Sequence, residues 1–135
     1  MKTIITGSKT IQNYNMVLDA IQSSGITPTE VFTSQEPGPP IFGYRWAVER
    51  KIPVKVFRID WKRHGNLAGM INNAEMCTFA DAIIVVADGR DWPTNHIIKY
   101  STQMDPPLRR HIVNVGPQEQ TLADYGRTQS ETNVG

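Results

Sequence analysis

The sequence contains a single cysteine, Cys77, among its 135 residues, so no disulfide can form within the chain. A zinc site built from several cysteines is excluded for the same reason. The three histidines, His64, His96 and His111, are far apart and lack the short spacing typical of metal ligands. We therefore expect no metal site.

Long hydrophobic runs are also missing. No apolar stretch approaches the roughly 20 residues that a membrane-spanning helix needs. The first residues, Met1–Ile5, lead directly into a strand-like run and lack the apolar core and cleavage site of a signal peptide. These features predict a cytoplasmic protein without a membrane partner.

Charge of one sign is not in excess, because the formal net charge is only +1. A balanced total does not favour nucleic acid as a partner. Basic residues cluster only at Lys62–His64 and at Arg109–His111. We interpret both clusters as parts of solvated loops.

Two well-known motifs, one for phosphate binding and one for catalysis, are absent. The chain has neither the Gly-x-x-x-x-Gly-Lys-Ser/Thr loop that cradles phosphates nor the Gly-x-Ser-x-Gly elbow of serine hydrolases. Asp60 and Asp88 both follow strand-like runs and could form a carboxylate pair, but their spacing alone does not bring them together. No catalytic residue is assigned.

Short apolar runs alternate with longer helical patterns along the chain. Strands are predicted at residues 3–6, 30–33, 54–59, 82–87 and 112–115, and helices at residues 13–24, 41–51, 68–79 and 94–103. Three prolines within residues 35–40 predict a loop without regular structure. This order predicts an α/β fold, namely a Rossmann-like three-layer αβα arrangement with a five-stranded, mostly parallel sheet.

The C-terminal residues differ in composition from the rest of the chain. Residues 1–116 carry the alternating pattern and are predicted to form one domain. Residues 117–135 are polar and are predicted to form a loosely ordered tail. An arm that docks on a partner is the alternative interpretation.

In an open parallel sheet, ligands bind outside the carboxyl ends of the strands, where the strand order reverses. The segments that follow the predicted strands therefore supply the candidate ligand-binding residues. These are Gly7, Ser8, Lys9, Ser34, Gln35, Gly38, Asp60, Trp61, Asn72, Asn73, Asp88, Gly89 and Thr94.

Each of these candidates has a simpler interpretation as well. Gly7–Lys9 offers a tight turn, a hydroxyl and a cation to an anion, but it could be an ordinary strand-to-helix turn. Trp61 and Trp92 could stack on a base or pack under a loop. Asn72 and Asn73 could bind a base edge or a ribose, or lie on a plain helix surface.

Several segments together resemble a known family. The matching segments are Gly7–Lys9, Gly43–Ala47, Ile59–Lys62, Gly65–Met76, Ala80–Ala82 and Asp88–Gly89. Over residues 2–115 the chain resembles the SLOG superfamily, a Rossmann-like group that includes DprA and the LONELY GUY nucleotide hydrolases. It is most similar to the YspA-like branch, which is common in bacteria and their phages. The resemblance implies a nucleotide-like ligand, and a phage-encoded protein would act in the host cytoplasm.

Departures from the family pattern concern the phosphate-binding loops. Where the YspA-like branch has Gly-Gly-Ala-x-Gly-Ala-Asp, this chain has Ser34–Pro40, which retains only Gly38. The second loop retains Thr94 but has Pro93 in place of a glycine and a negative charge at Asp91. Asn72 stands where the family has an arginine. All these changes are expected to weaken phosphate binding.

We therefore expect the crevice to bind a nucleotide-like small molecule without catalysis and without a cofactor. An N-glycosidic hydrolase of the LONELY GUY type is one alternative, but the family's glutamate three residues after the threonine is Ile97 here. An interaction protein that retains only the scaffold, such as a phage protein acting on a host factor or signalling nucleotide, is another. The helices at 41–51 and 68–79 are candidates for a homodimer interface, unless they only cover the sheet.

Overall fold

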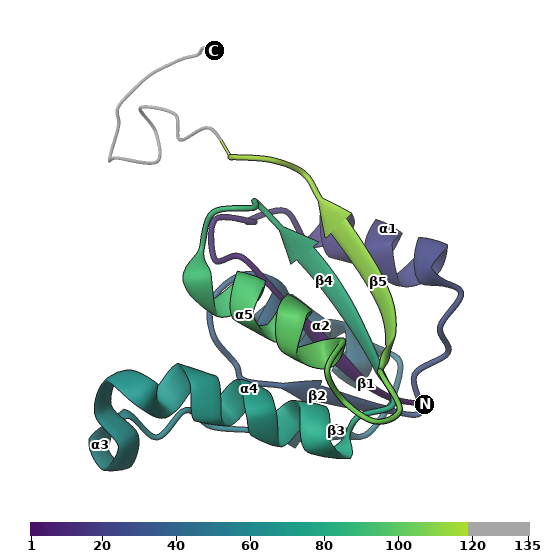
Figure 1. Ribbon diagram of the computed structural model, residues 1–135. Helices are drawn as coiled ribbons and strands as arrows, with labels where there is room; N and C mark the ends of the chain where they lie inside the picture. Colours follow the sequence, from purple (N-terminus) through teal and green to yellow (C-terminus); the bar gives the residue numbers. More distant parts are fainter. Residues whose placement is uncertain (119–135) are drawn as a thin grey trace.

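The computed structural model describes residues 1–118 and contains a five-stranded sheet in which all strands are parallel (Figure 1). The strands are β1 (Lys2–Gly7), β2 (Glu30–Thr33), β3 (Val54–Val56), β4 (Ala82–Ala87) and β5 (Arg109–Asn114). Their order in the sheet is β3-β2-β1-β4-β5. The predicted α/β Rossmann-like fold is confirmed.

Helices cover both faces of this sheet (Figure 1). The helices α1 (Tyr14–Ser24) and α2 (Pro39–Glu49) lie on one face, and α4 (Ala68–Phe79) and α5 (Trp92–Ser101) lie on the other. A short helix, α3 (Trp61–His64), and a 3-10 turn, η1 (Gly65–Leu67), lead into α4. These helices and the sheet form the three predicted layers.

Alternation of side chains along β4 divides the core into two clusters. Ile84 and Val86 pack with residues of α1 and α2, whereas Ile83 and Val85 pack with residues of α4 and α5. Every residue of β4 is buried, as the continuous β-branched run predicts for a central strand. The strand therefore lies between two apolar layers.

The prolines at positions 39 and 40 lie in a helix and not in the irregular loop predicted for residues 35–40. Helix α2 begins at Pro39, so the expectation of an irregular loop is wrong for Pro39 and Pro40. Proline lacks an N–H, but the first helical residues have no intrahelical acceptor for one, and its fixed φ suits a helix start. The two prolines therefore begin the helix.

Several predicted boundaries shift. Strand β3 ends at Val56 instead of Ile59. Phe57 still donates its N–H to the Thr33 carbonyl oxygen at 2.8 Å, and its ring packs against Phe32 with centroids 4.9 Å apart. Strand β5 begins at Arg109, and α5 begins at Trp92 because Asp91 caps it. The short helix α3 has no apolar periodicity that could have predicted it.

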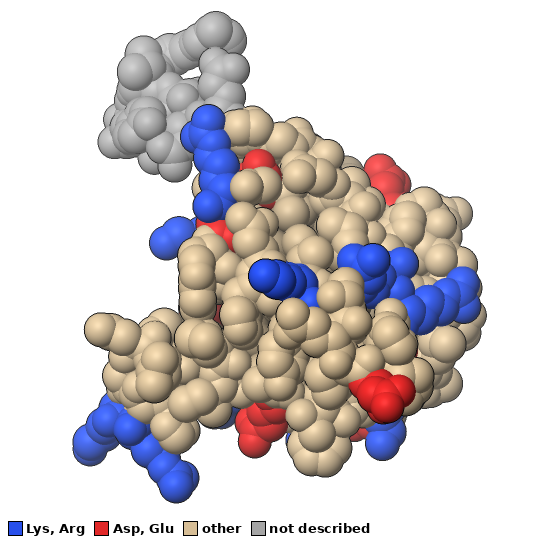
Figure 2. Space-filling view, viewed as in Figure 1, with Lys and Arg blue, Asp and Glu red and all other residues tan. Residues whose placement is uncertain are grey.

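Several further predictions concern the surface and the chain end. No helix within residues 1–118 is both long and apolar enough to cross a membrane. On the face shown in Figure 2, Lys and Arg side chains form small groups separated by neutral surface. Almost all of the predicted tail, residues 117–135, lies outside the described residues. Helices α2 and α4 pack against the sheet, and the homodimer stays a prediction.

The single thiol provides a test of the packing. Cys77 is 1% exposed, on the side of α4 that packs against the sheet, and burial raises its pKa to about 12. Because the thiolate is the reactive form, we expect the folded protein not to react with a thiol reagent such as Ellman's reagent at pH 8. In denaturing urea, one thiol per chain should react at once. Rapid labelling of the folded protein would contradict this packing.

Candidate functional site

A cavity of about 330 Å³ opens at the carboxyl ends of the strands. Its walls come from the end of β1, the β2–α2 loop, the segment after β3, helix α4 and the start of α5. Strand β1 lies between β2 and β4, so the connections on its two sides run to opposite faces and leave a crevice. This is the place that the parallel-sheet argument predicts for a ligand.

The cavity brings together residues from distant parts of the sequence. Seven of the predicted ligand-binding residues line it: Gly7, Lys9, Ser34, Trp61, Asn72, Asn73 and Thr94. Eight other lining residues are not among the predicted ligand-binding residues: Thr6, Glu36, Pro37, Pro40, Ile59, Gly69, Asp91 and Pro93. Glu36 and Asp91 could have been predicted because they follow strands. The contact of Gly69 with the cavity could not, because it depends on how α4 packs in the tertiary structure.

The other six predicted residues are not part of the cavity wall. Ser8 and Asp88 form a hydrogen-bonded pair behind it. The Ser8 hydroxyl accepts from the Asp88 backbone N–H at 2.9 Å and lies 3.1 Å from Oδ1 of Asp88. It also contacts Oδ1 of Asp91. Since a hydroxyl has one proton, Ser8 donates to one carboxylate at a time. Ser8 and Asp88 are each 5% exposed or less.

Asp88 is the centre of this network. Thr10 donates to its Oδ2 at 2.7 Å, and the backbone N–H of Arg90 donates to Oδ1 at 2.8 Å. Burial alone would raise the pKa of Asp88. The hydrogen bonds from the Arg90 N–H, Thr10, Ser8 and the Asp91 N–H outweigh that effect and lower the pKa. Asp88 therefore ties the β1–α1 loop to the end of β4.

Gln35 and Gly38 shape the β2–α2 loop. Both have positive φ, 65° for Gln35 and 90° for Gly38. A side chain at Gly38 would lie 3.0 Å from the Lys9 Cα and from the Ser8 carbonyl oxygen. Gly38 therefore allows the loop to pass close to the end of β1.

Asp60 and Gly89 also act locally. The Asp60 carboxylate accepts from the backbone N–H of Arg63 at 3.0 Å and caps α3. Gly89 has a φ of 85° and lies against the side chain of Asn114. Asp60 and Asp88, considered above as a carboxylate pair, accept hydrogen bonds from different partners.

Asp91 fills the N-terminus of α5 with a negative charge from the protein itself. Its Oδ2 accepts from the backbone N–H of Thr94 at 3.1 Å and from the Thr94 hydroxyl at 2.5 Å. Pro93, one of the two residues between them, has no N–H. Thr94 is thus a cavity-lining residue whose polar groups are already bonded.

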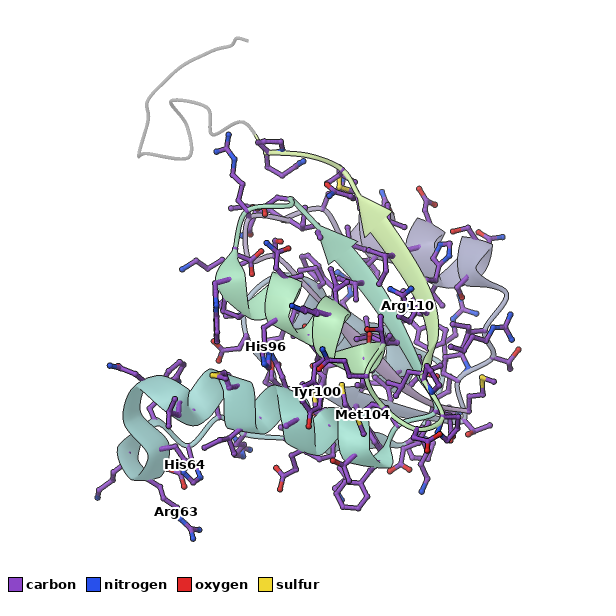
Figure 3. The ribbon with its side chains drawn as sticks, in the orientation of Figure 1. Arg63, His64, His96, Tyr100, Met104 and Arg110 are labelled. Atoms are coloured by element: carbon purple, nitrogen blue, oxygen red, sulfur yellow. The ribbon has the colours of Figure 1, made fainter. Side chains whose placement is uncertain are left out.

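Asn73 joins α4 to α5. Its Nδ2 donates to the Pro93 carbonyl oxygen at 3.1 Å and lies 3.1 Å from Nδ1 of His96. Burial lowers the pKa of His96, which favours the neutral ring whose Nδ1 can accept this bond. In Figure 3, His96 and Tyr100 lie on the side of α5 that faces α4. Both protons of the Asn73 amide are therefore used within the protein.

Asn72 is bonded differently from its neighbour. It lines the cavity and is 4% exposed, yet its Nδ2 is buried without a hydrogen-bond partner among residues 1–118. A buried amide that lacks a partner costs about 1–3 kcal/mol, so such groups are rare in native proteins. Asn72 is therefore a lining residue with a buried hydrogen-bond donor that no described residue satisfies.

The two tryptophans after strands have different surroundings. Trp61 is 55% exposed and forms part of the cavity wall. Trp92 is 54% exposed, does not line the cavity, and stacks on His96 with centroids 5.2 Å apart. Only Trp61 is available to a molecule in the cavity.

The described residues contain no group of three or more His, Cys, Asp or Glu side chains that could hold a metal ion. The side chains that line the cavity include an aromatic ring, two amides, hydroxyls and charged groups. In comparisons with known proteins, no family model matches the sequence. No curated protein matches it either. The function must be argued from the cavity itself.

Proposed function

We propose that this protein binds a nucleotide-like small molecule in the cavity at the carboxyl ends of the strands, without catalysis. The observation that carries the proposal is the position of Trp61 and Asn72 on the wall of a cavity of about 330 Å³ at the point where the strand order reverses. An aromatic face can stack on a base, and a side-chain amide can pair with a base edge. The volume is at the lower end of the range for small-molecule sites.

The resemblance to the YspA-like branch of the SLOG superfamily supports the same ligand class. The β2–α2 loop still has positive φ at Gln35, where the family pattern has a glycine, and at Gly38, where the glycine is retained. A glutamine in that conformation costs about 1–2 kcal/mol. The backbone course of the family's loop is therefore compatible with this chain, although two of its glycines have been replaced.

The absence of catalysis is proposed from the state of the acidic groups. The carboxylates of Asp88 and Asp91 both accept hydrogen bonds within the protein. Glu36 is exposed and is the one lining carboxylate within residues 1–118 that has no such bond. A hydrolase would need a positioned acid next to the glycosidic bond.

Binding can be tested by thermal shift with nucleosides, mono-, di- and cyclic nucleotides, ADP-ribose and NAD, followed by calorimetry on each compound that raises the melting temperature. Stacking of a base on an aromatic side chain contributes about 1–3 kcal/mol. We therefore expect Trp61→Ala to weaken binding about tenfold or more.

Trp92→Ala is the matched control, because Trp92 is equally exposed but does not line the cavity. It should leave affinity unchanged. If no compound in the panel binds the folded protein, the proposed function is wrong, and an interaction role for the scaffold takes its place. Release of free base that Glu36→Gln abolishes would instead establish the hydrolase.

A further inference from the structure

The cavity has few groups that could hold a phosphate, although it lies where phosphates bind in folds of this type. Within residues 1–118, Lys9 is the one cation among the lining residues, and the wall also includes two carboxylates, those of Glu36 and Asp91. The remaining lining residues are neutral, and five of them are prolines or glycines that bring no side-chain donor: Gly7, Pro37, Pro40, Gly69 and Pro93. The charge on the wall therefore does not favour an anion.

Helix α2 offers no free backbone donor at its start. Its first two residues, Pro39 and Pro40, have no N–H. The next two N–H groups donate to backbone carbonyl oxygens, Ile41 to Glu36 at 3.2 Å and Phe42 to Gly38 at 3.1 Å. The positive end of this helix is thus closed to an incoming phosphate.

Helix α5 is closed in another way. Its Pro93 has no N–H, and the N–H and hydroxyl of Thr94 both donate to the Asp91 carboxylate. That carboxylate occupies the position in which a bound anion would receive these bonds. A phosphate could take this place only by displacing a charge of the same sign.

The loop after β1 is occupied as well. The Ser8 N–H donates to the Val86 carbonyl oxygen at 3.0 Å, and the Ser8 hydroxyl is bonded to Asp88 and Asp91. Ser8 is fully buried. The donors of Ser8, Ile41, Phe42 and Thr94 at these strand-end segments are therefore all used within the protein.

Asn72, a lining residue, has a buried amide nitrogen, Nδ2, without a hydrogen-bond partner in the part of the chain that the structure describes. Rotation of the amide by half a turn exchanges its nitrogen and oxygen, so Asn72 can offer either a donor or an acceptor to a ligand. A planar molecule with adjacent donor and acceptor atoms, which is what a base edge provides, matches this group.

We propose that the ligand is an uncharged nucleoside, whose base pairs with the amide of Asn72 and stacks on Trp61, and that the site discriminates against the corresponding phosphates. The inference rests on the proposed function and specifies its ligand class. Neutrality follows from the closed helix ends and the carboxylates of Glu36 and Asp91, and the base follows from Asn72 and Trp61.

The test compares each nucleoside with its own 5′-monophosphate by calorimetry at low ionic strength, with the full-length chain. A charged hydrogen bond contributes about 1.5–3 kcal/mol, so a phosphate that lacks such bonds and is repelled should bind at least about tenfold more weakly than the nucleoside. Asn72→Leu, which keeps the branched shape of the side chain but removes both polar atoms, should abolish nucleoside binding while the free protein still unfolds in a single cooperative transition.

Charge variants separate repulsion from poor fit. Glu36→Gln should strengthen monophosphate binding several-fold relative to nucleoside binding, because the change removes a negative charge from the cavity wall. Glu75→Gln is the control, because Glu75 is exposed on α4 and does not line the cavity. It should change neither affinity.

Two results would overturn the inference, and they are distinguishable. If monophosphates bind as tightly as nucleosides or more tightly, the site accepts phosphate, the inference is wrong, and the proposed function remains. If neither class binds at millimolar concentration, the proposed function fails together with it.

Discussion

Replacement of Gly7 by alanine is expected to destabilise the protein by about 3 kcal/mol, since overpacking of this kind costs 1–3 kcal/mol and more where backbone must move. A Cβ at this position would lie 2.0 Å from the Val86 carbonyl oxygen and 2.6 Å from Cγ of Pro39. The first contact is with backbone of β4, and the second is with the first residue of α2. Both elements would have to move away from the end of β1.

Equilibrium unfolding in urea measures this effect, and Gly69→Ala is the matched control. Gly69 also lines the cavity, but a Cβ there would meet no atom within 4 Å, and its place in α4 favours alanine. We expect this control to be neutral or to stabilise the protein by about 0.5 kcal/mol. A Gly7→Ala protein with unchanged stability would show that β1, β4 and α2 do not meet as closely as described.

Replacement of Asp88 by alanine is expected to cost about 3 kcal/mol or more. The change removes the acceptor for the Thr10 hydroxyl and the Arg90 N–H, and it removes one of the two carboxylates next to Ser8. A buried donor that loses its partner costs about 1–3 kcal/mol, and more when the lost partner is charged. The loop after β1 would then no longer be tied to the end of β4.

The pH dependence of unfolding gives an independent measurement of the same network. Because hydrogen bonds lower the pKa of Asp88 in the folded state, its ionised form stabilises the fold fully above the unfolded pKa of about 3.9. This contribution is lost as the pH falls through the lower, folded value. The difference in stability between wild type and Asp88→Ala should therefore be constant near pH 7 and shrink below about pH 4.

Asp19→Ala is the control for both experiments on Asp88. Asp19 is exposed on α1, and its replacement should change stability by no more than about 0.5 kcal/mol. A difference between wild type and Asp88→Ala that stays the same down to pH 3 would contradict the role given to the carboxylate.

Much of the site could be located from the sequence, because parallel strands all end at one edge. The candidates at or after the ends of β1, β2, β3 and β4 therefore had to be neighbours, and five of them line one cavity together with Asn72 and Asn73 of α4. What the sequence could not provide was the bonding of each side chain. Ser8 and Thr94 have the residue types expected for ligand binding, but their polar groups are used by Asp88 and Asp91.

The neighbouring pair Asn72 and Asn73 shows the limit most clearly. Successive residues of a helix point about 100° apart, so two identical side chains meet different surroundings. Asn73 reaches Pro93 and His96 on α5, whereas the amide nitrogen of Asn72 meets no partner within residues 1–118. Trp61 and Trp92 are equally exposed, but only Trp61 lines the cavity.

The alternation of apolar runs and helical patterns by itself determined the fold class, because each strand that is buried on both faces requires helices on both sides. Only the tertiary structure decided which donors remain free at the strand ends. That outcome depends on contacts between segments about 80 residues apart, such as Ser8 with Asp88, and no local pattern encodes them.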